Sequence, residues 1–335
     1  MLCKYPIVAK NTGGIPVRCG QCLPCRIHKR RVWTHRMMLE ASQHEHNSFL
    51  TLTYRDEDLP QEYIHPKTGQ VYAPNTVRPD HHRSFINSLQ VDFKRKTGKT
   101  LKYYVCAEYG EKTARPHYHY ALFGFPTCTD IDSRKKHKRF TECSCNNCQY
   151  LQKKWGKGHI FLGDLTQDSA QYVAGYVTKK LTNENNEHTA RILDGRYPEF
   201  GRASLKPALG KEAWEAHINK IKRYIHTPED IPRFLLHNGK KWPIGDYLLL
   251  TAKNMLGFND EEWSLETSRS ERAKKDRQNH EKVLTMFEGQ KLDEEQKNLI
   301  SNGLPDVALR LLNSQKVLII EKRHDYKMHN KKEFA

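Results

Sequence analysis

The alternation of hydrophobic and polar positions predicts a β-sheet formed mainly by four segments of the chain. Ser48–Tyr54 is rich in β-branched and aromatic residues and has the length of a strand, and Gly158–Leu162 is a shorter run of the same kind. Lys102–Ala107 and His117–Phe125 are separated by a turn that contains glycine, which predicts an antiparallel hairpin. With helices packed on such a sheet, the expected fold class is α+β.

Helical periodicity occurs in several stretches between and after these strands. Arg26–His46, Asp80–Lys96 and Glu212–Tyr224 are each predicted to be helical. The clearest case is Gln167–Leu181, which has five apolar residues on one face: Ala170, Val173, Ala174, Val177 and Leu181. This stripe predicts a helix that packs against the sheet.

The opposite face of the Gln167–Leu181 helix carries Tyr172, Tyr176 and Lys179, spaced at i, i+4 and i+7. Packing does not require two phenols and an ammonium group on one face, so they are candidates for a functional role. The alternative is that both tyrosines pack at the rim of the sheet, as amphipathic side chains often do.

The patterns divide the chain into three predicted regions. Residues 1–47 form a cysteine-held knuckle and a basic helix, and residues 48–230 carry the strands, with a polar insertion at 127–150. Residues 231–335 are charge-dense, and much of this region alternates in sign, which is typical of exposed helices. We therefore expect a mostly helical C-terminal region.

The composition indicates a large polar surface with an excess of positive charge. Hydrophobic residues make up 37% of the 335 residues, and 56 Lys and Arg against 39 Asp and Glu give a formal net charge of +17. Such a charge favours a polyanionic partner, and nucleic acid is the expected one. No apolar run approaches the roughly 18–20 residues needed to cross a bilayer, and the first residues do not resemble a signal peptide. We expect a cytoplasmic protein that does not contact membranes.

Nine cysteines fall into two sets of four, with Cys106 on its own. The sets are Cys3, Cys19, Cys22 and Cys25, and Cys128, Cys143, Cys145 and Cys148. In a reducing compartment, tight C-x2-C spacing favours structural Zn²⁺ over disulfides. Iron–sulfur ligation of the first set and redox roles are the alternatives. Four thiolates leave no open coordination position, so either metal would be structural.

A His-x-His pair lies at the start of the fourth strand segment described above. Strand alternation places His117 and His119 on one face and the tyrosine that follows each of them on the other. Imidazoles suit borderline divalent ions, and a carboxylate from Glu108, or alternatively Glu111, would favour Mg²⁺ or Mn²⁺. With 18 histidines in the chain, about one such pair is expected by chance.

Together these features resemble the HUH endonuclease superfamily, in which U is a hydrophobic residue. More closely, the chain is similar to the replication initiators of small single-stranded DNA bacteriophages, the microviruses of the gokushovirus branch (Microviridae). Five segments carry the resemblance, in order: CGQCLPCR, FLTLTY, RPHYHYALFG, GDLTQDSAQYVAGYVTKK and EFGRASLKPALG. They lie within about residues 1–230. Two departures are Ala208, where a glycine is usual, and the second cysteine set, which replaces an ordinary loop.

The resemblance implies a ferredoxin-like HUH fold and a metal-dependent DNA endonuclease that initiates rolling-circle replication. It implies a catalytic Mg²⁺ or Mn²⁺ held by His117, His119 and Glu108. It also implies that Tyr176 or Tyr172, assisted by Lys179, attacks the viral strand at the origin. The products would be a 5′-phosphotyrosyl link, which allows later rejoining, and a 3′-OH for a host polymerase.

The expected partners are therefore single-stranded and origin DNA in the cytoplasm of a bacterial host, with a host polymerase and a host helicase. Two alternatives stay open. One is a plasmid initiator, relaxase or single-strand transposase of the same superfamily. The other is a zinc-bearing DNA-binding protein that is not an enzyme and in which the histidines are structural.

Overall fold

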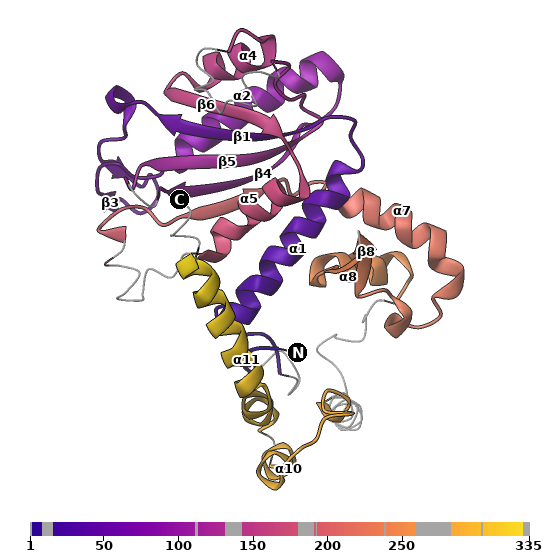
Figure 1. The fold of residues 1–335 in the computed structure, drawn as a ribbon. Coiled ribbons are helices and arrows are strands. Elements are labelled where there is room, and N and C mark those ends of the chain that lie inside the picture. The colour runs from indigo at the N-terminus through magenta and orange to yellow at the C-terminus, as the bar shows by residue number, and fades with distance from the viewer. Residues whose placement is uncertain are drawn as a thin grey trace. The chain divides into compact units, whose positions relative to one another are not determined.

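The computed structural model forms two compact units (Figure 1). One unit comprises Met1–Lys29 with Asn259–Ala335, and the other is Arg30–Phe258. The residues described are 2–8, 16–110, 113–130, 143–179, 191, 193–237, 239–258, 283–302 and 304–330, with the backbone alone described for 176–179, 229 and 326–330. The predicted regional boundaries at residues 47 and 230 stay a prediction.

The larger unit is built on a five-stranded antiparallel sheet with the strand order β6-β1-β5-β4-β7. The strands are β1 (Asn47–Tyr54), β4 (Lys102–Tyr109), β5 (Pro116–Phe123), β6 (Gly158–Asp164) and β7 (Phe200–Ala203). The His-x-His strand, β5, is central. The α+β class and the four predicted strands are confirmed, and β7 is an additional edge strand.

The first four strands and two helices have the ferredoxin-like arrangement. In chain order they are β1, α2 (Pro79–Thr97), β4, β5, α4 (Asn146–Trp155) and β6. The sheet order β6-β1-β5-β4 therefore places the fourth strand beside the first and the third beside the second. Each helix connects strands that are not neighbours in the sheet, so both helices can cover the same face.

The two faces of the sheet have separate cores. Along β1, buried and half-buried residues alternate strictly. Leu50, Leu52 and Tyr54 face the core under α2 and α4, together with Tyr118 and Tyr120 of β5. The other face is covered in part by α1 (Leu23–Ala41) and α5 (Gln167–Lys179), through residues such as Met37, Ala121, Phe123, Val173 and Ala174. Figure 1 shows α5 running across this second face.

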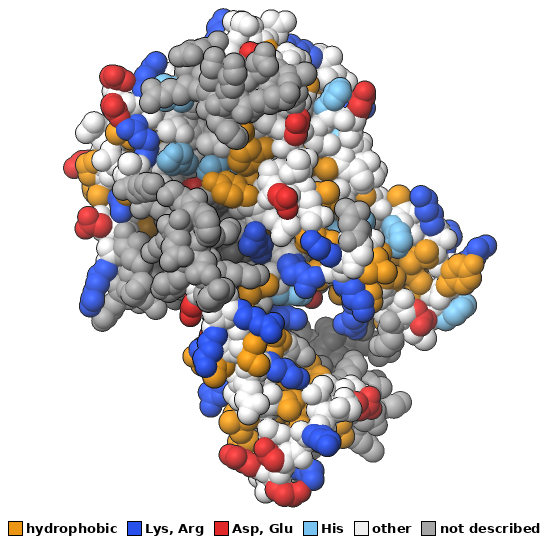
Figure 2. Space-filling view, viewed as in Figure 1, with side chains coloured by type: hydrophobic (Ala, Val, Ile, Leu, Met, Phe, Trp, Pro, Cys, Tyr) orange, Lys and Arg blue, Asp and Glu red, His pale blue; other side chains and the backbone are white. Residues whose placement is uncertain are grey.

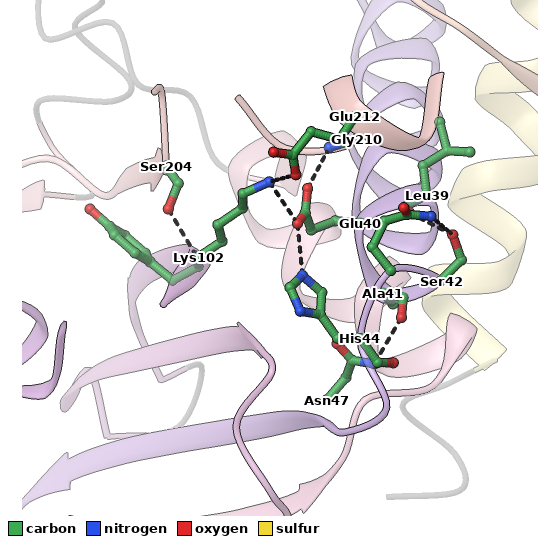
Figure 3. A network of polar contacts seen from close by, with 12 residues as sticks. Leu39, Glu40, Ala41, Ser42, His44, Asn47, Lys102, Ser204, Gly210 and Glu212 are labelled. Atoms are coloured by element: carbon green, nitrogen blue, oxygen red, sulfur yellow. Dashed lines mark hydrogen bonds and ion pairs between the residues drawn. The ribbon is translucent and has the colours of Figure 1, made fainter. Parts of the chain in front are cut away.

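A lobe of two helices and a hairpin follows the sheet. It comprises α7 (Lys211–Ile221), β8 (Phe234–His237), β9 (Lys240–Pro243) and α8 (Asp246–Met255), around a core that includes Trp214, Ile218, Ile244 and Leu248. The lobe is joined to α1 and β4 by a buried network of charges centred on Glu40 and Lys102 (Figure 3). The remaining short elements of this unit are η2 (Asp56–Asp58), β2 (Tyr63–Ile64), β3 (Val71–Tyr72), η4 (Lys222–Tyr224) and η5 (Pro228–Asp230).

The smaller unit contains the first cysteine set and the C-terminal helices. α10 (Glu294–Ser301) and α11 (Pro305–Asn330) pack around Phe287, Ile300 and Leu309, which confirms a mostly helical C-terminal region in the described part. None of the described helices combines the length and the apolar character that crossing a membrane requires.

Candidate metal and tyrosine site

The site lies on the sheet face that α5 covers only in part. On β5, His117 is opposite Glu108 of β4 and Thr53 of β1, whereas His119 is opposite Thr51. Residues that are opposite one another in a sheet have side chains on the same face. The register therefore places both histidines and Glu108 on one face, next to each other.

His119 is fixed by hydrogen bonds at both ring nitrogens. Its Nε2 lies 2.8 Å from Glu108 Oε1, and its Nδ1 lies 2.9 Å from the Thr51 hydroxyl. Both His119 and Glu108 are only 5% exposed. Burial lowers the pKa of His119 to about 4, so the imidazole is neutral at pH 7. It therefore donates one hydrogen bond to the carboxylate and accepts another from Thr51.

His117 is oriented by the backbone. Its Nδ1 lies 2.7 Å from the carbonyl oxygen of Arg115, and this oxygen can only accept a hydrogen bond. Burial, together with the neighbouring His119, keeps the pKa of His117 below its usual value, which favours the neutral ring. A proton on Nδ1 leaves the Nε2 lone pair available for a ligand, the arrangement usual for histidines that bind metals.

The donor types fit a divalent cation, although the ligand atoms do not converge on one point. The rings of His117 and His119 are parallel, with centroids 6.1 Å apart. Among the described residues, only the two cysteine sets bring three or more His, Cys, Asp or Glu ligand atoms within 4.8 Å of one another. Two neutral imidazoles and a carboxylate nevertheless provide the donors suited to Mg²⁺ or Mn²⁺. Glu111, the other candidate acid, lies outside the described residues.

Helix α5 brings a tyrosine to the histidines. The Tyr172 ring meets the His119 ring edge to face, with centroids 5.3 Å apart, and it also contacts Phe49 of β1. Tyr172 is 43% exposed, so its ring contacts the site from the solvent side. Tyr176 and Lys179 lie on the same helix, but their side chains are outside the described residues.

The position of α5 is set by small residues on both of its sides. Ala170, Val173 and Ala174 are buried against the sheet, as the predicted stripe requires. On another side, Arg30 of α1 donates from Nε to the carbonyl of Gln171, at 2.9 Å. A Cβ at Gly175 would lie only 3.3 Å from that Nε, so glycine is what admits the guanidinium. Val177 and Leu181 of the predicted stripe are not described at side-chain level.

The first cysteine set has the geometry of a metal site with four thiolate ligands. The Sγ atoms of Cys25 and Cys22 lie 3.5 and 3.8 Å from that of Cys3, and Cys25 Sγ lies 4.0 Å from Cys19 Sγ. Burial would raise the pKa of Cys19, but hydrogen bonds from the backbone N–H groups of Cys22 and Gln21 outweigh burial and lower the pKa to about 7. A stabilised thiolate is what Zn²⁺ binds.

The second cysteine set repeats this geometry between Phe125 and α4. Cys128 Sγ lies 3.6 Å from Cys143 Sγ and 3.7 Å from Cys145 Sγ. The N–H of Cys148 donates to Cys145 Sγ at 3.4 Å, and this bond helps to lower the pKa of Cys145 to about 6 against the effect of burial. Both sets can therefore hold a structural metal ion, whereas Cys106 lies apart from them.

Four residues at the site were not predicted from the sequence. Phe49 and Thr51 contact the Tyr172 and His119 side chains, and Arg30 and Gly175 hold the helix. The alternation along β1 could have identified Phe49 and Thr51, because it places them on the same face of the sheet. No local pattern identifies the pair formed by Arg30 and Gly175.

A ferredoxin-like sheet that presents His-x-His on its central strand, beside an acid and under a tyrosine-bearing helix, is the arrangement of the HUH class of proteins. Comparison with known proteins agrees. Residues 47–181 match the family model described as replication-associated protein ORF2. The replication-associated protein VP4 of Bdellovibrio phage phiMH2K is 30% identical over 242 residues, which are 72% of this chain and 68% of that protein. The chain belongs to this family of phage replication-associated proteins.

Two other relatives match over shorter regions. The replication-associated protein ORF2 of Spiroplasma virus 4 is 38% identical over 169 residues, and the replication-associated protein ORF4 of Chlamydia phage 1 is 28% identical over 168. These matches cover 49% and 50% of this chain, and the chain spans about half the length of the Spiroplasma virus relative, 48%, and 39% of the Chlamydia phage relative. No solved structure matches the chain. The resemblance to microvirus replication proteins is confirmed by these relatives.

Proposed function

We propose that this protein initiates rolling-circle replication by nicking and later rejoining the viral DNA strand at its origin, with a tyrosine as nucleophile. The observation that carries the proposal is the meeting of the Tyr172 ring with His119, which is itself hydrogen-bonded to Glu108. A phenol, two neutral imidazoles and a carboxylate are the groups that metal-assisted phosphodiester cleavage needs.

A divalent cation held by His117, His119 and Glu108 would supply positive charge to offset the charge that develops on the scissile phosphate. The residues of the chain prepare the site for it. The Arg115 carbonyl and the Thr51 hydroxyl hold the two imidazoles in position, and burial keeps His119 neutral. Burial beneath α5 also limits the access of water to the Glu108 carboxylate.

In the nicking step, a tyrosine oxygen attacks the phosphorus while the bond to the 3′ oxygen breaks. The phenol loses its proton to solvent, and the departing 3′ oxygen takes one up to become a 3′-OH. The 5′-phosphotyrosyl bond preserves the energy of the broken bond, so a 3′-OH can later attack it, restore the strand and release the phenol. The free 3′-OH would be the primer for a host polymerase inside the bacterial cell, after a host helicase has opened the duplex.

Two tyrosines on one helix suggest a division of labour. One would hold the first 5′ end while the other cuts the regenerated origin. Tyr176 has Lys179 three residues later on the same helix, and an ammonium group there would stabilise a phenolate. We therefore expect Tyr176 to attack first and Tyr172 to act in the second step.

The lobe after the sheet offers a surface for single-stranded DNA. Lys241 Nζ lies 4.6 Å from the ring centre of Phe234, which is 45% exposed, and Leu236 beside it is also exposed. Figure 2 shows Lys and Arg side chains interleaved with hydrophobic ones over this lobe. Exposed aromatic rings among cations are suited to stacking bases and neutralising phosphates.

We propose that both cysteine sets hold Zn²⁺ and that the metal is structural. Each set supplies four Sγ atoms within 4.8 Å of one another, and in each set the backbone stabilises one thiolate. The purified protein should therefore contain about two zinc ions per chain by elemental analysis. A zinc content near zero after purification without chelators would contradict this.

The function is tested by trapping the covalent adduct. Protein is incubated with single-stranded origin oligonucleotide and Mn²⁺, denatured, and examined for a protein–DNA band. Wild type and Tyr224→Phe, a control at a tyrosine that is 63% exposed and lies outside the sheet, should both form it. The Tyr172→Phe/Tyr176→Phe double variant should form less than about a thousandth as much.

The other outcomes separate the alternatives. DNA binding without any adduct in the wild type would favour a DNA-binding protein that is not an enzyme. An adduct that forms equally well in the double Phe variant would show that another residue attacks. Cleavage of plasmid origin or transfer-origin DNA in preference to phage origin DNA would favour a plasmid initiator or relaxase.

A further inference from the structure

A third histidine lies in the same row of the sheet as the candidate metal site. The row crosses four strands: His159 of β6 is opposite Thr53 of β1, which is opposite His117 of β5, which is opposite Glu108 of β4. All four side chains are on the face that carries α5. Adjacent strands lie about 4.8 Å apart, so the backbones at His159 and His117 are separated by roughly 10 Å.

The burial pattern agrees with this placement. On β6, Gly158, Ile160 and Leu162 are buried toward the core under α2 and α4, while His159 and Phe161 are half-buried on the other face. Phe161 meets Phe49 edge to face, which ties the next row to the site that contains Tyr172. His159 is therefore part of the same surface as His117.

The ring of His159 has an unmet hydrogen-bonding group. Its Nδ1 is buried and has no hydrogen-bond partner among the described residues. A buried polar atom without a partner costs about 1–3 kcal/mol, and such atoms in native proteins often mark a ligand site. In contrast, both nitrogens of His119 and the Nδ1 of His117 are already engaged.

The space between the two outer histidines suits a phosphate group. Thr53 is the only residue between them in the row, and its side chain is short. A gap of roughly 10 Å between strands accommodates a phosphate that makes contacts of about 2.8 Å on both sides. Arg115 adds positive charge at this end of the sheet, where it donates to the Tyr54 carbonyl and pairs with Asp56.

We propose that His159 binds the scissile phosphate, by donating a hydrogen bond to a non-bridging oxygen on the side opposite the metal ligands. This inference rests on the proposed nicking function and assigns a substrate contact to a residue outside the metal and tyrosine motifs. His159 would hold the phosphate in line with the attacking phenol, and Thr53 would mark the floor of the phosphate site.

The test measures the coupling between His159 and one phosphate of the DNA. The nick position is first mapped from the 3′ end of the cleaved strand. Two oligonucleotides are then compared, one natural and one with an uncharged methylphosphonate at the mapped position. Binding of each is measured by fluorescence anisotropy in EDTA, so that the result does not depend on the metal or on cleavage.

The expected result is a loss that depends on the phosphate. His159→Ala should bind the natural strand about 10-fold more weakly than wild type, and the two proteins should bind the methylphosphonate strand equally. His159→Gln keeps an N–H donor and should recover part of the affinity. His46→Ala, which removes an exposed imidazole just before the other end of β1, should match wild type with both strands.

Each other result overturns the inference. If the wild type forms no covalent adduct, the proposed function fails and the inference fails with it. If the wild type forms the adduct but His159→Ala binds like His46→Ala, the inference alone is wrong. An equal loss on both strands would place the His159 contact somewhere other than the scissile phosphate. Should His159→Ala not fold, as judged by its thermal transition, His159→Gln and the two strands carry the same comparison.

Discussion

Replacing Lys102 by methionine should destabilise the protein in a way that depends strongly on pH. Lys102 Nζ lies 2.9 Å from Glu40 Oε1 and 2.6 Å from Glu212 Oε2 (Figure 3). Glu40 also accepts from His44 Nε2 at 2.8 Å and from the Gly210 N–H at 2.9 Å. The Glu40 and Lys102 side chains are only 1% and 6% exposed. The network thereby fastens α1, β4 and α7 together, and methionine keeps the length of the lysine stem while removing its charge.

The magnitude follows from the choices left to the Glu40 carboxylate. Burial alone would raise the pKa of Glu40, but the hydrogen bonds from His44, Gly210 and Lys102 outweigh burial and hold it below the ordinary 4.5. In the wild type, Glu40 therefore contributes stability above about pH 4.5, and this contribution is lost as the pH falls. Without Lys102 the balance shifts and the pKa rises, so the variant loses stability as the pH rises.

Protonation sets the size of this loss. Bringing a carboxyl group of ordinary pKa into its neutral form costs about 1.36 × (7 − 4.5), or about 3.4 kcal/mol, at pH 7, and about 0.7 kcal/mol at pH 5. Breaking a buried pair by removing one partner costs about 3–5 kcal/mol in general. We therefore expect Lys102→Met to lower the free energy of unfolding by about 3 kcal/mol at pH 7 and by about 1 kcal/mol at pH 5.

The assay is urea unfolding of the full chain at both pH values, compared with Lys211→Met. Lys211 pairs with Glu215 at 3.5 Å on the surface of α7, with both side chains about one-third exposed. Its loss should be below about 0.5 kcal/mol and nearly equal at the two pH values. The reasoning is refuted if Lys102→Met loses no more than Lys211→Met, or if its loss is as large at pH 5 as at pH 7.

Three further outcomes are expected. Gly175→Ala should fail to give the roughly 1 kcal/mol that alanine normally adds in a helix, because its Cβ would meet Arg30, and the gain should return in an Arg30→Ala background; thermal unfolding of the four proteins measures this. Cys148→Ser should lower the zinc content by about one ion per chain, by elemental analysis, and lower the thermal midpoint, whereas Cys106→Ser should leave the zinc content unchanged. EDTA should abolish adduct formation within minutes and Mn²⁺ should restore it, whereas persistence of the adduct reaction in EDTA would argue against a catalytic metal.

Much of the sheet could be predicted because strand alternation is a local signal. The pattern of β1 and the hairpin of β4 and β5 can be read from neighbouring residues, and the structure places them within two residues of the predicted bounds. β7 was missed because FGRA is four residues long and none of them is buried. β8 was missed because FLLH follows a proline-rich stretch and three of its four residues are exposed, which hides any alternation.

The candidate site was predictable only as far as one element at a time. The i, i+2 spacing puts His117 and His119 on one face, and the helical period puts Tyr172 on the exposed side of α5. The contact between His119 and Glu108 follows from the hairpin register, which the turn length suggests but does not fix. His159 needs two further register relations, through β1, and no pattern within β6 contains them.

The contrast between the two halves of the sheet face explains why chemistry is expected at one end of it. α5 approaches the sheet closely where the residues beneath it are small, Ala121 and Cys106, and its own stripe there is Ala170 and Ala174. The row beyond, with His117 and its neighbours, bears longer polar side chains and stays partly exposed, because a helix cannot pack closely on them without burying unpaired polar groups. The tyrosine face of the helix therefore lies at the boundary between a packed apolar core and an open polar row. A larger residue at position 121 would lift α5 away from this boundary, so a change such as Ala121→Leu should slow adduct formation more than it weakens DNA binding.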